Sequence, residues 1–167
     1  IRLFKKCGAV IKTILTASAK EFVTPLSVTS LSQGKVYGDL FSVENEAEMD
    51  HISLSRWAEV IVIAPATANT ISKLAQGTTD DLASTVVLAS DKDIILAPAM
   101  NVRMWEHPTT KKNLKKLKEF GYKLIDPPVP VDSITGVLNP LPPNLSATTV
   151  AYGNTVDEPT ILFDLLL

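Results

Sequence analysis

The stretch richest in groups that could do chemistry is APAMNVRMWEHP, residues 97–108, in which an apolar run ends at Pro98. Two methionines, an asparagine and a tryptophan follow, where an ordinary turn would carry Gly, Ser or Asp. The amide of Asn101 offers N–H donors and an oxygen acceptor, which suits binding of a substrate carboxylate or amide. Met100 and Met104 offer soft apolar walls for an aromatic ring or a thioether. Such residues usually fill a core, so their position after a predicted strand is what favours a binding loop.

A second candidate is PATANT, residues 65–70, which follows another apolar run and opens a predicted helix. The first N–H groups of a helix have no partner within it, so with an Asn/Thr pair they could hold an anion or the polar edge of a flat heterocycle. A plain N-cap explains the same residues about equally well. The candidate ligand-binding residues of this stretch are Pro65, Ala66, Thr67, Asn69 and Thr70.

The stretch TASAKEF, residues 16–22, repeats this pattern one unit earlier in the chain. Thr16 and Ser18 end a predicted strand and could donate hydrogen bonds to a phosphate, and Phe22 could lie against a ring. A hydroxyl N-cap followed by a core phenylalanine explains the residues equally well.

The candidate general base is His51, one of two histidines in the sequence. A neutral imidazole near physiological pH can take a proton from a substrate, although a lone histidine is more often structural. Asp50 precedes His51, but neighbours in a helix do not face each other, so the spacing predicts no Asp–His dyad. For His107, which precedes Pro108, the sequence likewise indicates no catalytic partner.

Apolar runs that alternate with helical patterns must position these residues. The strands are expected at 9–16, 60–65, 93–98 and 122–126, and the helices at 1–7, 17–32, 66–77, 80–90 and 109–121. A short amphipathic segment is expected at 51–59. Nearly continuous apolar strands indicate a parallel sheet covered on both faces. The predicted fold is therefore α/β: a doubly wound, Rossmann-like sheet in three αβα layers, with the candidate residues at the carboxyl ends of its strands.

Two parts of the chain are expected, a domain over 1–126 and an irregular flap or arm over 127–167. Prolines break the second part, and the segment EPTILFDLL, 158–166, is expected to be a helix that docks back on the domain. Residues 33–41 are expected to form a turn. The abrupt start suggests that further residues precede Ile1.

Composition favours a cytoplasmic protein. The formal charge of −2 and pI near 5.7 give no basic surplus for nucleic acid, and no apolar run is long enough to span a membrane. The single cysteine, Cys7, excludes an internal disulfide, and no Cys/His cluster has the spacing of a metal site.

The stretches HISLSRW, PATANT and PAMNVRMW, in this order and spacing, strongly resemble the homo-oligomeric flavin-containing cysteine decarboxylases. Three longer segments are most similar to the bacterial branch of that family that serves coenzyme A synthesis. They are RWAEVIVIAPATANTISKLAQG, DDLASTVVLA and APAMNVRMWEHP. The resemblance covers roughly residues 1–126.

This resemblance implies FMN bound between the subunits of a trimer, which can assemble further into a dodecamer. It implies that Asn101 holds the substrate carboxylate, that Met104 lines the substrate site and that His51 is the base. The flavin-contacting positions of the family fall on Thr16, Ser18, Phe22, Pro65, Ala66, Thr67, Asn69, Thr70 and Met100.

The implied reaction converts 4′-phosphopantothenoylcysteine, a small phosphorylated cysteine conjugate, to 4′-phosphopantetheine. Oxidation of the thiol side to a thioaldehyde creates an electron-poor carbon that can accept the electrons left when CO2 departs. The resulting enethiol is then reduced, and the flavin carries both redox steps.

One departure from the family keeps two alternatives open. Enzymes of the coenzyme A branch carry a flap cysteine, whereas no cysteine follows Cys7 in this sequence. The segment most similar to the family's flap is VAYGNTVDEP, in which Tyr152 occupies the position of the cysteine. The same chemistry on the C-terminal cysteine of a peptide, which releases an enethiol, is one alternative. A flavin-binding regulatory subunit without turnover is the other.

Overall fold

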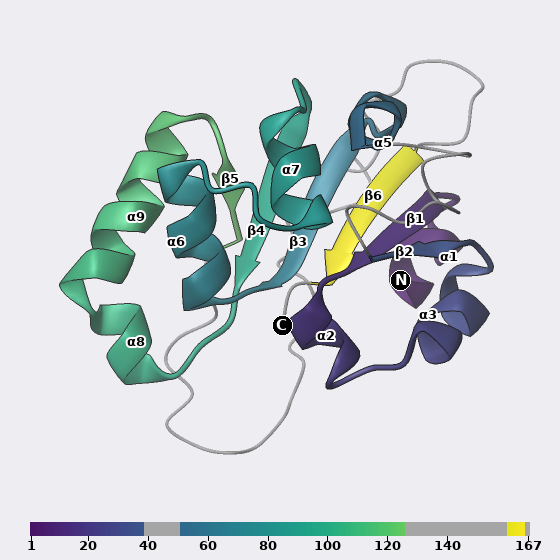
Figure 1. The fold of residues 1–167 in the computed structure, drawn as a ribbon, viewed down its shortest axis with the longest axis horizontal. Helices are drawn as coiled ribbons and strands as arrows, with labels where there is room; N and C mark the ends of the chain where they lie inside the picture. Colours follow the sequence, from purple (N-terminus) through teal and green to yellow (C-terminus); the bar gives the residue numbers. More distant parts are fainter. Residues whose placement is uncertain (39–50, 126–159, 166–167) are drawn as a thin grey trace.

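A single parallel sheet organises the computed structural model, which describes residues 1–38, 51–125 and the strand at 160–165. Its strands lie in the order β2-β1-β6-β3-β4-β5 (Figure 1). They are β1 Val10–Leu15, β2 Val36–Tyr37, β3 Val60–Ala66, β4 Asp93–Pro98, β5 Lys123–Leu124 and β6 Thr160–Leu165. The predicted doubly wound α/β fold is confirmed, because all pairings are parallel and helices connect the strands.

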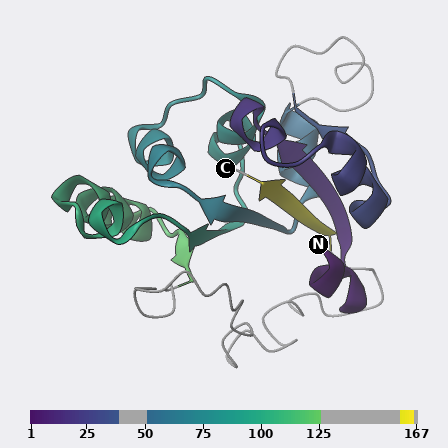
Figure 2. The same cartoon turned by 90° about the horizontal axis from the view of Figure 1, so that it is seen from below.

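Helices cover both faces of the sheet, as Figure 2 shows for α6 and α7 on one side and α1 on the other. The helices are α1 Arg2–Lys6, α2 Ala17–Lys20, α3 Pro25–Ser32, α5 His51–Trp57, α6 Ala68–Gln76, α7 Leu82–Leu88, α8 Val102–Glu106 and α9 Pro108–Glu119. Alternate residues of each strand divide between the faces. Ile61 and Ile63 enter the main core under α5, α6 and α7, whereas Val62 joins Ile11 on the face of α1.

Capping groups fix where the helices at the carboxyl edge of the sheet begin. The Thr67 hydroxyl accepts a hydrogen bond from the Thr70 N–H at 3.3 Å and starts α6, which ends at Gly77 with φ of 73°. Asp81 starts α7 through a capping box with Ser84. These caps hold the first turns of both helices beside the strand ends.

Three expected boundaries differ from the structure. The single helix expected at 17–32 is two helices, because Thr24 caps a new helix and Pro25 occupies its first position. The expected turn at 33–41 contains the short strand β2, which pairs with β1. The loop expected after Pro98 becomes α8, with Asn101 as its N-cap.

The helix expected at 158–166 is wrong, since residues 160–165 form the strand β6. This strand pairs along its length with β1 on one side and with β3 on the other, so it completes the middle of the sheet. A short apolar run fits a strand or a helix equally well by periodicity alone. The remainder of the predicted flap, Tyr152 included, lies outside the described residues.

Candidate functional site

A cavity of about 250 Å³ lies where the first turns of α2, α6 and α7 meet, and we name it the α2/α6/α7 cavity. It brings together four of the residues predicted to contact a flavin, namely Thr16, Ser18, Asn69 and Thr70. The rest of its lining is Ala17, Lys73, Leu74, Asp80, Asp81 and Ser84. The carboxyl edge of the sheet is therefore a shared site, as the predicted topology requires.

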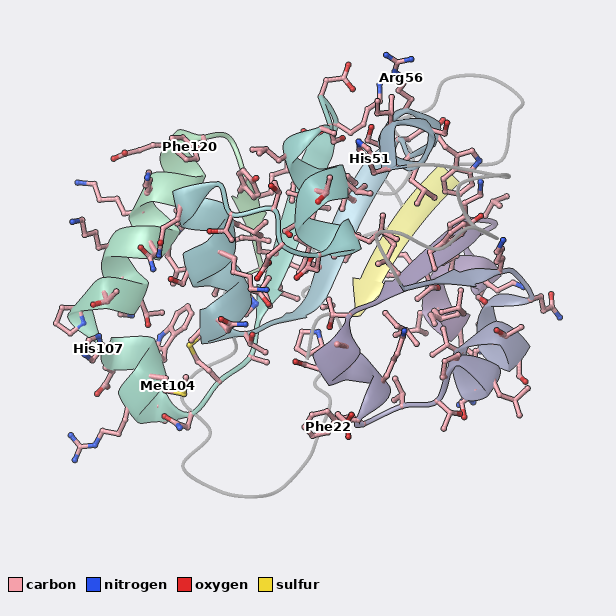
Figure 3. The ribbon with its side chains drawn as sticks, in the orientation of Figure 1. Phe22, His51, Arg56, Met104, His107 and Phe120 are labelled. Atoms are coloured by element: carbon pink, nitrogen blue, oxygen red, sulfur yellow. The ribbon has the colours of Figure 1, made fainter. Side chains whose placement is uncertain are left out.

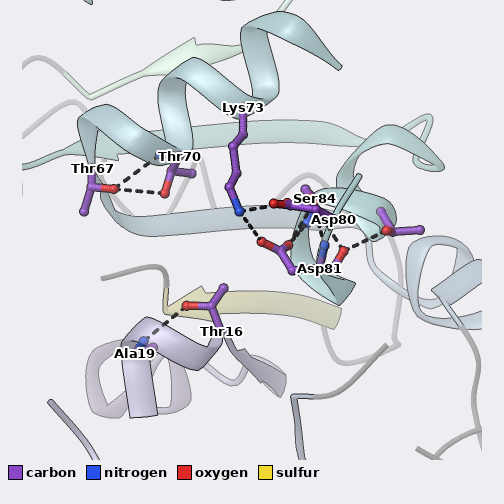
Figure 4. A network of polar contacts seen from close by, with 9 residues as sticks. Thr16, Ala19, Thr67, Thr70, Lys73, Asp80, Asp81 and Ser84 are labelled. Atoms are coloured by element: carbon purple, nitrogen blue, oxygen red, sulfur yellow. Dashed lines mark hydrogen bonds and ion pairs between the residues drawn. The ribbon is translucent and has the colours of Figure 1, made fainter. Parts of the chain in front are cut away.

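A polar network joins α6 to α7 at this cavity (Figure 4). Lys73 Nζ donates to Asp80 Oδ1 at 2.7 Å and to Asp81 Oδ2 at 3.0 Å. Asp81 Oδ1 in turn accepts from the N–H and the hydroxyl of Ser84, both at 2.8 Å. The network fixes the spacing between the two helices that form the wall of the cavity.

These contacts shift the pKa values of both charged partners. The hydrogen bond to Asp80 raises the pKa of Lys73 against the opposing effect of burial, and Asp81 adds to the rise. Burial alone would raise the pKa of Asp81, but the hydrogen bonds from the Ser84 N–H and from Lys73 outweigh it and hold the pKa below its usual value. Lys73 and Asp81 are thus both charged at neutral pH.

The lining of this cavity suits a polar cofactor with hydroxyl and carbonyl groups. The hydroxyls of Ser18, Thr70 and Ser84 can donate or accept, and the Asn69 amide can do both. The Thr16 hydroxyl already accepts from the Ala19 N–H at 3.2 Å, so it retains its proton as a donor. This donor and acceptor set fits the polar parts of a flavin.

A second cavity, of about 480 Å³, lies on the other side of the start of α6, and we name it the α6/α8/α9 cavity. It brings together the two predicted substrate-binding residues, Asn101 and Met104. The other residues that line it are Ala68, Ser72, Arg103, His107, Thr109, Thr110 and Asn113. The beginning of α6 thus separates two cavities, with Ala68 lining one and Asn69 the other.

Asn101 has two roles in this second cavity. Its Oδ1 accepts the Met104 N–H at 2.9 Å and caps α8, which fixes the orientation of the side chain. Its Nδ2 has no acceptor among the described residues, so two N–H donors remain for a ligand. An amide held in this way can bind a carboxylate.

The other predicted flavin-contacting residues do not line the α2/α6/α7 cavity. Ala66 is fully buried in the main core, and its carbonyl accepts the Ala99 N–H at 3.1 Å. Pro65 belongs to β3, Thr67 caps α6, and Met100 packs partly against the main core. Phe22 follows α2 and is 73% exposed; Figure 3 labels its side chain. Flavin contacts at these positions stay predictions.

His51 stands apart from both cavities. It opens α5 and lines neither of them. Figure 3 shows it at the opposite end of the molecule from Phe22 and Met104. Within one chain the structure therefore does not bring the predicted base to Asn101.

Sequence reasoning did not single out Lys73, Asp80, Asp81 and Ser84, nor Arg103. Spacing could have indicated Lys73, because it follows Asn69 and Thr70 by four and three positions and so shares their helix face. The motif Asp81 to Ser84 is a recognisable capping pattern. The ion pair of Lys73 with Asp80 crosses a turn, so no periodicity predicts it.

The described residues contain no group of three or more His, Cys, Asp or Glu side chains arranged to hold a metal. In the same part of the chain, every helix is too short or too polar to cross a bilayer.

Known proteins share both the sequence and the fold. The Flavoprotein family model matches residues 1–147. The chain is 45% identical over 122 residues to the coenzyme A biosynthesis bifunctional protein CoaBC of Bacillus subtilis, an alignment that covers 73% of this chain and 30% of that protein. It is 38% identical over 124 residues to a probable phosphopantothenoylcysteine decarboxylase of Streptococcus mutans, covering 73% of this chain and 69% of that protein.

A solved structure agrees with these relatives. It is a cysteine-to-serine variant of PPC decarboxylase in complex with pantothenoylaminoethenethiol, 36% identical, with a TM-score of 0.62 over 76% of this chain and 74% of that one. The chain spans about 30% of the length of the Bacillus subtilis bifunctional relative. By the family model and by these similarities, the chain belongs to the Flavoprotein family, in the group that includes the phosphopantothenoylcysteine decarboxylases.

Proposed function

We propose that this chain is an FMN-dependent decarboxylase that converts 4′-phosphopantothenoylcysteine to 4′-phosphopantetheine, as a cytoplasmic homo-oligomer. The observation that carries the proposal is the pair of cavities that flank the start of α6. One is lined by four residues expected to contact a flavin, and the other by Asn101 and Met104. Similarity to phosphopantothenoylcysteine decarboxylases supports the substrate.

Thr16, Ser18, Asn69 and Thr70 would hold the flavin, and the Lys73 network would hold the start of α7 against α6, which carries Asn69 and Thr70. FMN bound there would supply the redox chemistry of the reaction. Because one chain lines only a partial enclosure of about 250 Å³, a neighbouring subunit would complete it.

Asn101 would bind the substrate carboxylate through its two amide N–H donors. The cap contact to the Met104 N–H fixes the amide before the substrate arrives, which reduces the entropy lost on binding. A neutral amide also suits a carboxylate that must lose its charge as CO2, because a cation would stabilise the reactant more than the transition state. Met104 would supply an apolar wall next to it.

His51 would act as the base in the site of a neighbouring subunit, since it lines neither cavity of its own chain. Mixed oligomers test this assignment. His51→Asn and Asn101→Asp subunits, each inactive alone, should regain part of the activity when they are unfolded together and reassembled with FMN. Because some interfaces in a mixture carry two intact halves, complete inactivity of the mixture contradicts the assignment.

The substrate is tested by competition. FMN-loaded protein is offered equal concentrations of 4′-phosphopantothenoylcysteine and of a peptide that ends in cysteine, and both products are followed by mass spectrometry. The proposal expects 4′-phosphopantetheine with little change in the peptide. An oxidised peptide enethiol as the main product would refute the substrate assignment.

The peptide substrate is the second candidate, because no cysteine follows Cys7 to supply a proton donor in the flap. If the substrate is a peptide, the reaction ends at the enethiol, and turnover then requires an external oxidant for the flavin. Release of an enethiol rather than a thiol from either substrate therefore separates the two candidates.

A further inference from the structure

We propose that the α6/α8/α9 cavity is also an anion subsite for the phosphate of the substrate, and that Arg103 makes it selective for a phosphorylated substrate. The inference rests on the proposed function, which supplies a phosphorylated cysteine conjugate. It assigns a role to a side chain outside the predicted flavin and carboxylate sites.

The two cavities differ in the charge of their linings. Lys73 in the α2/α6/α7 cavity is paired with both Asp80 and Asp81, so its positive charge is already compensated. The described residues that line the α6/α8/α9 cavity include no carboxylate, and Arg103 is their cation. The charge of the lining therefore attracts an anion more strongly in the second cavity than in the first.

Hydrogen-bond donors also predominate in the α6/α8/α9 cavity. The Asn101 oxygen is engaged by the Met104 N–H, which leaves the amide N–H groups for a ligand. His107 Nδ1 accepts the Thr109 N–H at 3.2 Å, so a neutral ring carries its proton on Nε2 and donates from there. The hydroxyls of Ser72 and Thr109 add two more donors.

The surroundings of Arg103 favour a dianion. Arg103 is exposed and has no hydrogen bond or ion pair within the part of the chain that the structure describes, so its guanidinium is available. The first turn of α9, a helix of 12 residues, contributes Thr109 and Thr110 to the lining. The helix carries lysines at 111, 112, 115, 116 and 118. These charges give the helix that lines one side of the cavity a net positive charge.

Arg103 fits the phosphate better than the reacting carboxylate. A guanidinium presents a planar fork that matches phosphate oxygens, and a phosphate keeps its charge throughout the reaction. Residues two positions apart do not face each other, so Asn101 and Arg103 contact different parts of the cavity. The carboxylate and the phosphate of one folded substrate would thus have separate binding groups.

Binding of two unreactive probes to the FMN-loaded protein tests the inference directly. Isothermal titration calorimetry compares 4′-phosphopantothenate with pantothenate, which differ only in the phosphate. The wild-type protein should bind the phosphorylated probe more tightly. Arg103→Gln should raise the Kd for that probe about tenfold and leave the Kd for pantothenate unchanged. Arg103→Lys should keep part of the preference, because it retains the charge without the fork.

The matched control is Arg2→Gln, which removes an exposed arginine from α1, a helix that lines neither cavity. It should bind both probes as the wild type does. A wild-type protein without preference for the phosphorylated probe overturns the inference. An Arg103→Gln protein that binds both probes as before, or weakens both equally, also overturns it.

Kinetics separate this inference from the proposed function. With 4′-phosphopantothenoylcysteine, Arg103→Gln should raise KM and leave kcat close to the wild-type value. The unphosphorylated pantothenoylcysteine should show no such change. A lost phosphate preference in a protein that releases no CO2 supports the subsite and refutes the proposed function. If the protein releases CO2 and neither KM nor kcat changes in Arg103→Gln, the proposed function is supported and the phosphate subsite is refuted.

Discussion

The two cavities on either side of α6 are both lined by residues at the starts of helices, but their linings differ in charge and in free hydrogen-bond donors. In the α2/α6/α7 cavity the cation Lys73 is held by two carboxylates, and hydroxyl groups line the space between helix ends. In the α6/α8/α9 cavity the oxygen of Asn101 is used by a cap and its donors remain, next to Arg103. One cavity suits a polar, largely neutral surface, and the other suits an anion. The start of α6 therefore borders two cavities that differ in charge, with Asn69 in one and Ala68 in the other.

The largest effect that this contrast predicts is that of Asn101→Asp. The new carboxylate keeps an oxygen that can cap α8, but it replaces the amide donors with a negative charge that repels the substrate carboxylate. We expect kcat/KM for CO2 release to fall on the order of 100-fold or more, with FMN content unchanged.

Asn101→Ser is the control for the cap, because serine also caps a helix and adds no charge. It should lose activity as well, since it lacks the amide. Activity near the wild-type level in both variants would mean that Asn101 does not bind the carboxylate.

The next effect is on the opposite cavity. Asn69→Ala removes an amide that lines the α2/α6/α7 cavity while the cap of α6, which is Thr67, stays intact. The Kd for FMN, measured by quenching of flavin fluorescence, should rise roughly tenfold. Activity should recover when FMN is in excess, unlike that of Asn101→Asp. If FMN binds as tightly as before, the assignment of this cavity to the flavin loses its support.

A third substitution should damage both cavities together. Thr67→Ala removes the hydroxyl that caps α6, and the free energy of unfolding should fall by about 1 kcal/mol. Urea denaturation of the FMN-free protein measures this change. Thr67→Ser keeps the capping oxygen and should stay within a few tenths of a kcal/mol of the wild type. Equal losses in the two variants would point to the methyl group instead of the cap.

The smallest effect concerns the pH dependence of stability. The folded pKa of Asp81 is lowered, so the charged carboxylate stabilises the protein fully above its unfolded value near 3.8. That contribution is lost as the pH falls from 3.8 toward the folded pKa. Asp81→Asn keeps a capping oxygen and removes the charge, so it should cost about 0.5–1 kcal/mol at pH 7, because solvent screens this partly exposed pair.

Asp81→Asn should also flatten the acid side of the stability curve, which urea titrations between pH 3 and 7 would show. Glu119→Gln, which removes an exposed carboxylate outside both cavities, is the matched control. If the free energy of unfolding falls as steeply with decreasing pH in Asp81→Asn as in the wild type, the role given to Asp81 is contradicted.

The sequence predicted the parts of the fold that have strong local signals. The apolar runs of β3 and β4 and the stop of α6 at Gly77 could be recognised because burial and capping leave a pattern in neighbouring residues. The break before α3 also has a local signal, because Thr24 caps the helix and Pro25 occupies its first position. The strand β6 could not be recognised, because its pairing with β1 and β3 depends on residues far away in the chain.

The same distinction applies to the site. Thr16, Ser18, Asn69 and Thr70 were predicted together because parallel strands place their carboxyl ends at one edge. The pairing of Lys73 with Asp80 and the separation of His51 from Asn101 are tertiary facts without a local pattern. Arg103 was missed because an exposed arginine in a short helix looks like an ordinary surface residue until the cavity around it is known.

The most direct test of the account is release of labelled CO2 from 4′-phosphopantothenoylcysteine carrying ¹³C in the cysteine carboxyl group. Holoprotein with one FMN per chain is compared with Asn101→Asp holoprotein by mass spectrometry of the gas phase. We expect labelled CO2 from the wild type, with an equal amount of decarboxylated product, and almost none from the variant. Labelled CO2 at equal rates from both proteins, or none from the wild-type holoprotein, would contradict it.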